Sequence, residues 1–387
     1  MNVALFPAAG LLFVATAALA LPHIPRDDAA VVEQLPGRRD APAQGELRRL
    51  RAALAEQPGD PQRAAALGKR YFELANAEGD PRYIGYAEAA LRPWQTDDAP
   101  AEVLYVRGLL LQYRHDFDAA LTRFAAALRQ DPQHYGARAW RAAIFMVRAD
   151  YAAAARECAA LPVDRDDIHA IGCASYIEAT TGKLRPAYER LSRALRENVD
   201  TAPQARLWLL TRLAEMAWRL DDKAAAERWF RQALALGVDD NFLLADYADF
   251  LLEEGRAKEV VPLLRDWTRS DTLLLRLAMA EKRLGMREAQ GHIQALGERF
   301  AAAALRGERL HMGEEARFLL DLKGDAKGAL RVGLENWKEQ REPRDALVVL
   351  EAAVAARAPA AAAPVLEWLH DSRFESPRLR RVAQALR

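Results

Sequence analysis

His169 and Cys173 are the residues whose types and spacing come nearest to reactive chemistry in this chain. They lie four residues apart in a stretch predicted to be helical, so both side chains fall on one helix face. An imidazole beside a thiol can activate a nucleophilic cysteine, but a third group must orient the imidazole. The sequence offers no residue for that role. We therefore interpret Cys173 as a small buried side chain beside a partly exposed ring, and we assign no catalytic residue.

Other signatures of enzymes and metal proteins are missing from the sequence. None of the seven histidines belongs to an HExxH motif or lies four residues from another histidine, as a zinc site would favour. There is no GxGxxG or GxxxxGK[ST] phosphate loop and no GxSxG nucleophile elbow. Paired acids occur at predicted turns, where aspartate favours helix N-caps: Asp97-Asp98, Asp166-Asp167, Asp221-Asp222 and Asp239-Asp240. We expect no metal, no cofactor and no enzymatic activity.

The composition indicates a helical protein without a polyanionic partner. The chain of 387 residues has 55 basic and 55 acidic side chains, so its net charge is zero. Domains that bind nucleic acid usually carry a basic excess, and none is present here. Ala, Leu, Arg and Glu, all good helix formers, dominate the sequence, and long runs of Val, Ile and Thr are absent. These features predict an all-α fold and no nucleic-acid partner.

The N-terminus resembles an export signal. Residues 1–20 contain no charged side chain, and Ala18-Leu19-Ala20 fits the small residues that precede a cleavage point. We expect a signal peptide over 1–20, with an uncleaved membrane anchor as the alternative, because about 20 apolar residues can span a bilayer. Both interpretations place the rest of the chain outside the cytoplasm, in the periplasm or cell envelope. The alternative adds an inner-membrane anchor, which would be the chain's only contact with the membrane. Residues 21–43 hold four prolines among charges and are predicted to be a linker.

A repeat of 34 residues organises the rest of the chain. In residues 101–134, small residues stand at places 8, 20 and 27, aromatic residues at places 17 and 24, and proline at place 32: Gly108, Ala120, Ala127, Phe117, Phe124 and Pro132. Small residues let two helices approach closely, aromatic residues fill the space between neighbouring hairpins, and proline ends the second helix. This segment closely resembles the tetratricopeptide repeat. The resemblance implies a right-handed α-solenoid of helix hairpins.

The same register continues along the chain and sets the expected boundaries. Further units start near Tyr135, Ile168, Leu207 and Asn241, and two weaker units have turn glycines at Gly285 and Gly324. We predict divergent N-terminal hairpins over 44–100, tetratricopeptide-like repeats over 101–343 and C-terminal capping helices over 344–387. A polar outer face is expected of terminal units, and the Arg-rich end of the chain suits one.

The resemblance also implies where a partner binds. In the family, the first helix of each hairpin lines a continuous concave groove, with places 2, 5, 9 and 12 facing the ligand. The candidate groove residues are Tyr105, Gln112, Tyr176, Trp208, Glu215, Trp218 and Asp249. The family's cytosolic chaperone-binding members hold a carboxylate with Lys and Asn, but Tyr105 and Leu109 stand at those places here, so that activity is not transferred.

The groove composition leaves several interpretations open. Aromatic residues with a polar group are favoured anchors at protein interfaces, which predicts a protein or peptide partner and a scaffold function. The same rings could stack on sugars, so the alternative is a glycan-binding module of cell-surface polysaccharide or cell-wall machinery. An enzyme on a helical toroid would need paired acids facing a cavity, whereas the acids here cluster in turns, and Glu215 and Asp249 are the only groove acids that we would test for this role. Several of the aromatic rings could instead belong to the solenoid core.

Two smaller features remain. Arg82, Tyr83 and Tyr86 could form a patch at the N-terminal mouth of the groove, or a structural lid on the first hairpin. Their stretch is similar to one in exported bacterial repeat proteins, with no activity implied. Cys158 and Cys173 fall at places 24 and 6 of consecutive units, whose helices should pack side by side. They could form a disulfide or remain two free core cysteines.

Overall fold

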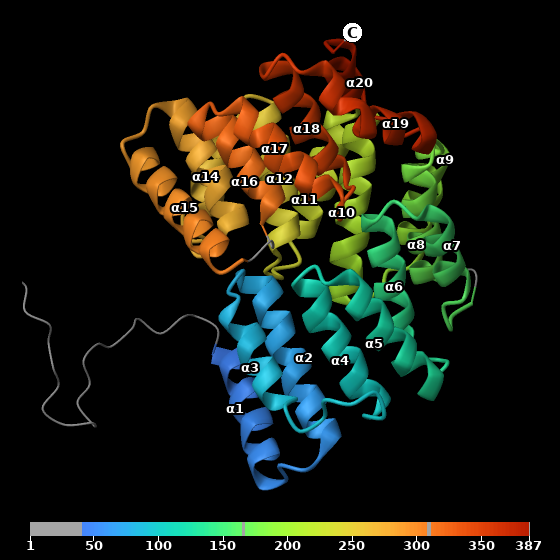
Figure 1. Cartoon of the computed structure of the whole chain (residues 1–387). Coiled ribbons are helices and arrows are strands. Elements are labelled where there is room, and N and C mark those ends of the chain that lie inside the picture. The colour runs from blue at the N-terminus through green and yellow to red at the C-terminus, as the bar shows by residue number, and fades with distance from the viewer. Residues whose placement is uncertain (1–40, 165–166, 308–310, 387) are drawn as a thin grey trace, which may run out of the picture. The chain divides into compact units, whose positions relative to one another are not determined.

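The structure is a computed structural model that describes residues 41–164, 167–307 and 311–386. Residues 47–387 form one compact unit, to which the contacts below belong. The predictions of a signal peptide and of most of the linker lie outside the described residues. Within the described part of the chain there are helices and no strands, which confirms the predicted all-α solenoid (Figure 1).

Helices follow one another in antiparallel pairs, and those from α2 to α17 form the hairpins of the solenoid. The first helices of the hairpins are α2 (Pro61–Glu78), α4 (Ala101–Tyr113), α6 (Tyr135–Val147), α8 (Ile168–Thr180), α10 (Pro203–Arg219), α12 (Asn241–Glu253), α14 (Asp271–Leu284) and α16 (Met312–Phe318), which continues as the π-helical turn η1 (Leu319–Lys323). The second helices are α3 (Arg82–Ala90), α5 (Phe117–Gln130), α7 (Tyr151–Ala159), α9 (Leu184–Glu197), α11 (Lys223–Leu234), α13 (Ala257–Leu264), α15 (Glu288–Leu305) and α17 (Ala326–Trp337).

Five further segments flank the hairpins. They are α1 (Ala41–Glu56) at the start, and α18 (Pro343–Ala355), the short 3-10 helix η2 (Pro359–Ala362), α19 (Ala363–Ser372) and α20 (Pro377–Gln384) at the end. Helix α1 begins inside the segment predicted as a linker, because Ala41 already has helical backbone geometry.

The turn inside each hairpin repeats one backbone conformation. One residue there has a positive φ in hairpin after hairpin, and these residues are His115, Ala149, Gly182, Asp221, Gly255, Gly285 and Gly324. The glycines expected at turns are confirmed. A left-handed residue ends the first helix and reverses the chain, and glycine adopts this conformation without the steric cost that other residues bear.

The aspartate pairs serve the helix ends, as predicted. The side chains of Asp167, Asp222 and Asp240 accept hydrogen bonds from backbone N–H groups in the first turns of α8, α11 and α12, respectively. These N–H groups have no partner inside the helix, so a carboxylate there satisfies them. One acid of each of these three pairs therefore caps a helix.

Gly108 shows why the repeat needs small residues at fixed places. A Cβ atom at this position would lie only 2.5 Å from the ring of Phe124, so α4 and α5 could not approach as they do. Phe124 itself is fully buried. The close contact between the two helices therefore depends on the glycine and the aromatic residue together.

The buried cores differ greatly in size along the chain. One large core extends over α2–α6, and another over α8–α15. Between them lies a small core whose buried members are Ala142, Ala154, Cys158 and Ile177. Here the structure joins Cys158 and Cys173 in a disulfide, the pairing that the sequence left open. A covalent link thus crosses the small core between the two large ones.

Segments that are distant in the sequence also touch. The side chain of Asn241 donates a hydrogen bond of 3.0 Å to the backbone carbonyl of Asn76, which links α12 to α2. The backbone N–H of Arg341 donates to the carbonyl of Val147 at 2.7 Å. The sequence predicted a continuous groove but not these contacts between distant hairpins. Repeat periodicity defines each hairpin but does not specify which distant hairpins meet.

Candidate functional site

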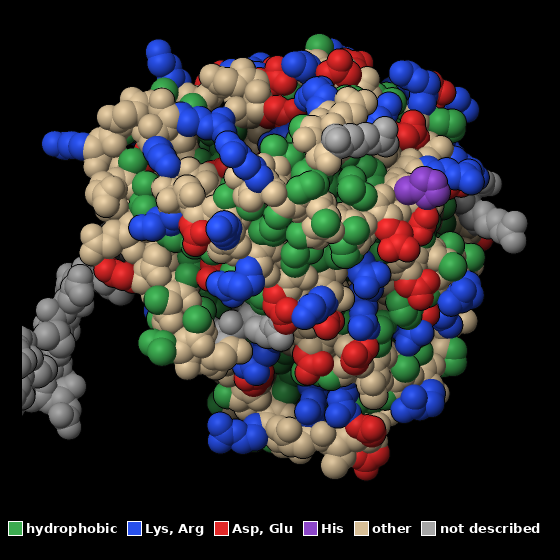
Figure 2. Space-filling model, turned by 45° about the horizontal axis from the view of Figure 1, so that its top comes forward, with side chains coloured by type: hydrophobic (Ala, Val, Ile, Leu, Met, Phe, Trp, Pro, Cys, Tyr) green, Lys and Arg blue, Asp and Glu red, His purple; other side chains and the backbone are tan. Residues whose placement is uncertain are grey.

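The candidate site is an interior cavity of about 1760 Å³, which we call the central cavity. First helices of hairpins from α2 to α16 line it, together with the start of α18 and the segment around α20. Its wall carries basic, acidic and aromatic side chains together. Charges of both signs also alternate over the outer face in Figure 2, which fits the zero net charge of the chain. The cavity is large enough for a peptide segment rather than only a small ligand.

Four rings near the N-terminal ends of α6, α8, α10 and α12 form what we call the aromatic rim. They are Tyr135, His169, Trp208 and Phe242, and all four line the central cavity. Tyr135 is 39% exposed, Trp208 is 40% exposed and Phe242 is 54% exposed. Trp208 and Phe242 stand at place 2 of consecutive repeat units, and Tyr135 stands at place 1 of an earlier unit. Large exposed apolar side chains gathered along one wall mark a surface for contact.

Trp208 is held in place by its neighbours although it remains open to solvent. A Cβ atom at Gly172 would come within 2.9 Å of the indole ring, so the glycine on α8 makes room for it. Tyr176 meets the indole edge-on, with ring centroids 6.2 Å apart. Among the described residues, no hydrogen bond is made by the indole N–H of Trp208, which leaves a donor for a ligand.

A charged network lies beneath this rim. Arg212 donates hydrogen bonds to Glu215 at 2.7 Å and to Asp246 at 3.2 Å. The guanidinium of Arg344, at the start of α18, lies 3.5 Å from Asp246 and above the ring of Phe242. Burial raises the pKa of Asp246, although the two arginines act to lower it. The network therefore holds a carboxylate whose charged form is disfavoured by its surroundings.

Most of the predicted groove residues line the cavity. Gln112, Tyr176, Trp208, Glu215, Trp218 and Asp249 are all part of its wall. Glu215 pairs with Arg212, and Asp249 forms a two-pronged ion pair with Arg276 at 3.0 and 2.7 Å. The two groove acids that an enzyme would need are therefore both bound to arginine.

Tyr105 differs from the other predicted groove residues. Only 7% of it is exposed, it does not line the cavity, and its ring packs on His134 with centroids 4.5 Å apart. A Cβ atom at Gly136 would lie 2.7 Å from this ring, so the next first helix leaves a gap that Tyr105 fills. Burial raises the pKa of Tyr105. The core interpretation applies to this residue.

Arg82, Tyr83 and Tyr86 lie outside the cavity wall. Arg82 is bound to Asp80 at 2.5 Å, and this hydrogen bond raises the pKa of Arg82 and lowers that of Asp80. Both tyrosines pack on Tyr71, with ring centroids 6.1 Å and 5.6 Å away. The structure brings the three residues together as a cluster on the first hairpin.

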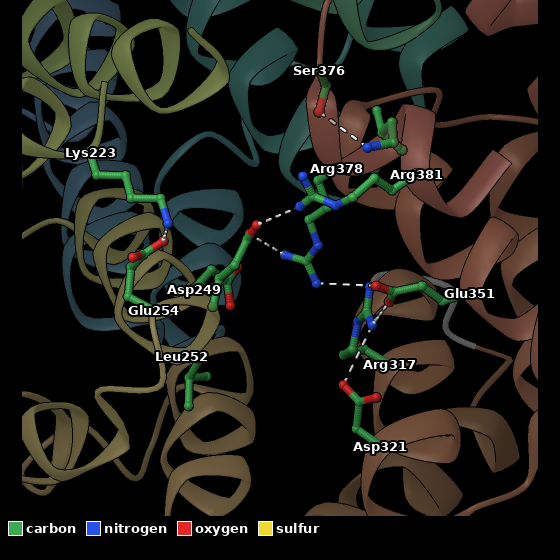
Figure 3. A network of polar contacts seen from close by, with 12 residues as sticks. Lys223, Asp249, Leu252, Glu254, Arg317, Asp321, Glu351, Ser376, Arg378 and Arg381 are labelled. Atoms are coloured by element: carbon green, nitrogen blue, oxygen red, sulfur yellow. Dashed lines mark hydrogen bonds and ion pairs between the residues drawn. The ribbon is translucent and has the colours of Figure 1, made fainter. Parts of the chain in front are cut away.

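The opposite ends of α8, α10 and α12 are covered by the chain's own C-terminal segment. Residues 372–379, which we call the C-terminal strap, lie against the last turns of these helices. Phe374 packs on Arg219, and Arg378 binds Glu253. Arg381, which follows the strap on α20, extends toward the same carboxylate, and Figure 3 shows the two arginines side by side. Sequence reasoning missed the strap, because nothing in the repeat register relates the chain end to α10.

Two absences concern the described residues only. No group of three or more histidine, cysteine and acidic side chains there could hold a metal ion. No helix in that part of the chain is long and apolar enough to cross a membrane. Cys158 and Cys173 line the cavity as a disulfide, so neither presents a thiol beside His169.

No family model and no curated protein matches the chain. Among solved structures, the chain is similar to yeast Tom70, with a TM-score of 0.40 and 11% identity over 89% of this chain and 84% of that one. It is also similar to the APC/C hetero-tetramer Cut9-Hcn1, with a TM-score of 0.30 and 13% identity over 90% of this chain and 94% of that one. A third similarity is to the TPR domain of P58(IPK), with a TM-score of 0.21 and 14% identity over 89% of this chain and 93% of that one. At these values no correspondence between residues follows, and the site is defined by this chain's own contacts.

Proposed function

We propose that the chain is a non-catalytic scaffold that takes a segment of a partner protein into the central cavity across the aromatic rim. The observation that carries this proposal is a row of partly exposed rings near the N-terminal ends of first helices that line the cavity: Tyr135 on α6, Trp208 on α10 and Phe242 on α12. Rigid aromatic side chains supply much contact area at low entropic cost, and they dominate the energetics of protein interfaces.

The cavity chemistry supports binding rather than catalysis. Glu215 and Asp249 are both held by arginines, so neither is placed as a free general acid or base. Charged side chains that are already paired in a protein can still orient a polar partner through their remaining donors and acceptors. The wall thus offers rings for affinity and a fixed charge pattern for orientation.

We further propose that this scaffold works in the bacterial cell envelope. The support is the sequence alone: an uncharged, apolar stretch over residues 1–20 that ends in Ala18-Leu19-Ala20. A disulfide between Cys158 and Cys173 suits an oxidising compartment outside the cytoplasm. Fractionation of cells that produce the full chain, with N-terminal sequencing of the mature protein, would test both export and cleavage after Ala20.

Site-specific photo-crosslinking tests the binding site. A photo-reactive phenylalanine analogue at Phe242 would lie in the aromatic rim, and the same analogue at Leu305 provides a control, because Leu305 is 91% exposed and lies outside the cavity wall. We expect a discrete protein adduct from position 242 and none from position 305. Equal adducts from both positions would contradict the proposal.

The variant Trp208→Ala separates a binding role from a structural one. We expect the adduct at position 242 to be lost while thermal unfolding changes little, because the indole is already partly exposed. A large drop in melting temperature with the adduct unchanged would make Trp208 a core residue. Retention of the protein on immobilised cell-wall polysaccharide, abolished by Trp208→Ala, would instead favour the glycan alternative.

A further inference from the structure

The C-terminal strap occupies a site that is built like a peptide-binding surface. Phe374 is 4% exposed, and the guanidinium of Arg219 lies 3.8 Å from the centre of its ring. Arg219 is itself buried and is held independently of the strap, because it binds the carboxylate of Glu215 and the backbone carbonyl of Ala179. A stacked guanidinium with a fixed orientation forms one wall of a pocket for an aromatic ring.

Glu375, which directly follows Phe374, caps the N-terminus of α9. Its carboxylate accepts a hydrogen bond of 2.8 Å from the backbone N–H of Leu184, the first residue of α9. Lys183, at the N-cap of α9, supplies no side-chain hydrogen bond to the helix. The backbone carbonyl of Glu375 also accepts from Arg219 at 3.0 Å. An acid from a distant part of the chain thus meets donors that the helix leaves unsatisfied.

Arg378 provides the third contact and spans two elements. Its guanidinium binds Glu253 at the end of α12 at 2.8 Å and Glu351 on α18 at 3.1 Å. Figure 3 draws the contact between Arg378 and Glu351 as a dashed line. Glu351 is also bound by Arg317, whereas Glu253 is paired only with the strap's Arg378 and with Arg381, among the described residues. Without the strap, Glu253 would keep only the more distant Arg381, at 3.8 Å.

Half of the strap is buried, namely Ser372, Phe374, Ser376 and Leu379, and Phe374 also packs on Trp368 of α19 with ring centroids 5.3 Å apart. Leu379 is the only buried residue of α20, and Phe374 is the large ring that anchors the preceding loop. Proteins open locally at a lower free energy than that of global unfolding. Local opening of the strap would uncover the surface beneath it.

We propose that this surface is a second peptide site, filled by the chain itself, and that its partner is a protein segment of the same chemistry. That segment has an aromatic residue followed directly by an acid, with a basic residue three positions later, as in Phe374, Glu375 and Arg378. This inference rests on the proposed scaffold function and deepens it, because it names the chemistry of a segment that the scaffold would bind. Such a partner displaces the strap and meets Arg219, the N-terminus of α9 and Glu253 in its place.

Fluorescence anisotropy with a labelled synthetic peptide of residues 372–379 provides the test. The full-length protein with Phe374→Ala and Glu375→Gln has a weakened strap, and it should bind the peptide at least about tenfold more tightly than the wild type. This factor follows if the strap leaves the site open in fewer than about one molecule in ten. A peptide in which alanine replaces the phenylalanine should bind neither protein.

A milder pair of variants protects the test against misfolding. Arg378→Ala removes a strap contact, whereas Arg380→Ala changes an exposed arginine of the same helix and makes a matched control. The peptide should bind Arg378→Ala more tightly than Arg380→Ala, with the circular dichroism of both unchanged. Equal binding to wild type and weakened variants, or no binding to folded variants, would overturn the proposal.

The outcome is separable from that of the proposed function. Crosslinking at Phe242 reports on the aromatic rim, and the peptide titration reports on the site under the strap. Loss of the crosslink with intact peptide binding would remove the proposed function and leave a peptide-binding surface. A crosslink at Phe242 with no peptide binding would leave the scaffold and remove only this inference.

Discussion

The two ends of helices α8, α10 and α12 differ in their exposure to solvent. At their N-terminal ends, His169, Trp208 and Phe242 form the aromatic rim, which remains partly exposed and retains a hydrogen-bond donor without a partner in the described structure. At their C-terminal ends, the strap buries Phe374 and pairs the charged groups around it. We call this second region, formed by the strap and the helix ends beneath it, the covered rim. The same helices thus present one surface open to a partner and another already covered. In this solenoid the chain's own strap covers part of the inner face, and the remainder stays uncovered.

The largest difference between the rims should appear in local opening. Phe374→Ala should accelerate hydrogen exchange of the strap amides, such as that of Leu379, by about a hundredfold or more. Loss of a buried phenylalanine costs about 3 kcal/mol, and about 1.4 kcal/mol corresponds to a factor of ten. Trp208→Ala is the comparison and should leave the amides at the start of α10 almost unchanged. Similar acceleration at both rims would abolish the distinction.

Removing the disulfide should affect the hairpins that carry both rims. Cys158 and Cys173 close a loop with a separation of 15 residues, for which the chain-entropy estimate is about 3 kcal/mol of stability. Cys158→Ala with Cys173→Ala should lower the free energy of unfolding by about this amount, measured by urea denaturation. Exchange at the last turn of α14, which lies in the large core, should change least. A double variant as stable as the wild type would show that the small core is sufficient.

The ion pairs of the strap should contribute less than its ring. Glu253→Gln removes the partner of Arg378 and Arg381, and partly exposed pairs are typically worth about 0.2–1 kcal/mol each. We expect a loss near 1 kcal/mol, with faster exchange confined to the strap. Glu254→Gln is a matched control, since Glu254 pairs with the exposed Lys223 and not with the strap. Equal effects of the two variants would mean that Glu253 does not hold the strap.

The two rims should respond to acid in opposite directions. Burial acts to raise the pKa of Glu351, but Arg317 and Arg378 outweigh it and hold this pKa below its usual 4.5. Its stabilising contribution is present above pH 4.5 and is lost as the pH falls through the lowered value. Asp246, whose pKa is raised by burial above its usual 3.8, contributes stability at low pH that is lost as the pH rises through the raised value.

Denaturation series from pH 6 to pH 3 would test this contrast. Glu351→Gln should flatten the loss of stability at the acidic end, because a neutral amide no longer takes up a proton. Asp246→Asn should remove a gain over the same interval, so its stability should fall more steeply on acidification than that of the wild type. Identical slopes for both variants and the wild type would remove this electrostatic difference between the rims.

The smallest stability effect belongs to the aromatic rim. Trp208→Ala should change the free energy of unfolding by less than about 1 kcal/mol, because the ring is 40% exposed and its removal opens little buried space. Thermal melting with Leu305→Ala as the reference would measure it. A loss of several kcal/mol would show that the rim is a structural feature like the strap.

Particular residues show how far a sequence can be read. Gly108 and Phe124 stand at repeat places whose packing demands are local, and the structure places them in the predicted contact. Tyr105 and Trp208 were expected on one face, but only Trp208 lines the cavity. The difference comes from the neighbouring helix, where Gly136 leaves a gap that Tyr105 fills. Both residues were visible in the sequence, but their contact depends on the packing of consecutive hairpins.

The sequence by itself determined the helices, the turns and the all-α repeat, because helix propensity, capping and the 34-residue spacing act between residues close in the chain. Only the tertiary structure decided that Asn241 meets Asn76 and that the strap covers the end of α10. Such contacts join segments 165 and 156 residues apart, where small rotations between successive hairpins accumulate. No local pattern of residues determines how these rotations add up, so the central cavity and its two rims follow from the folded array alone.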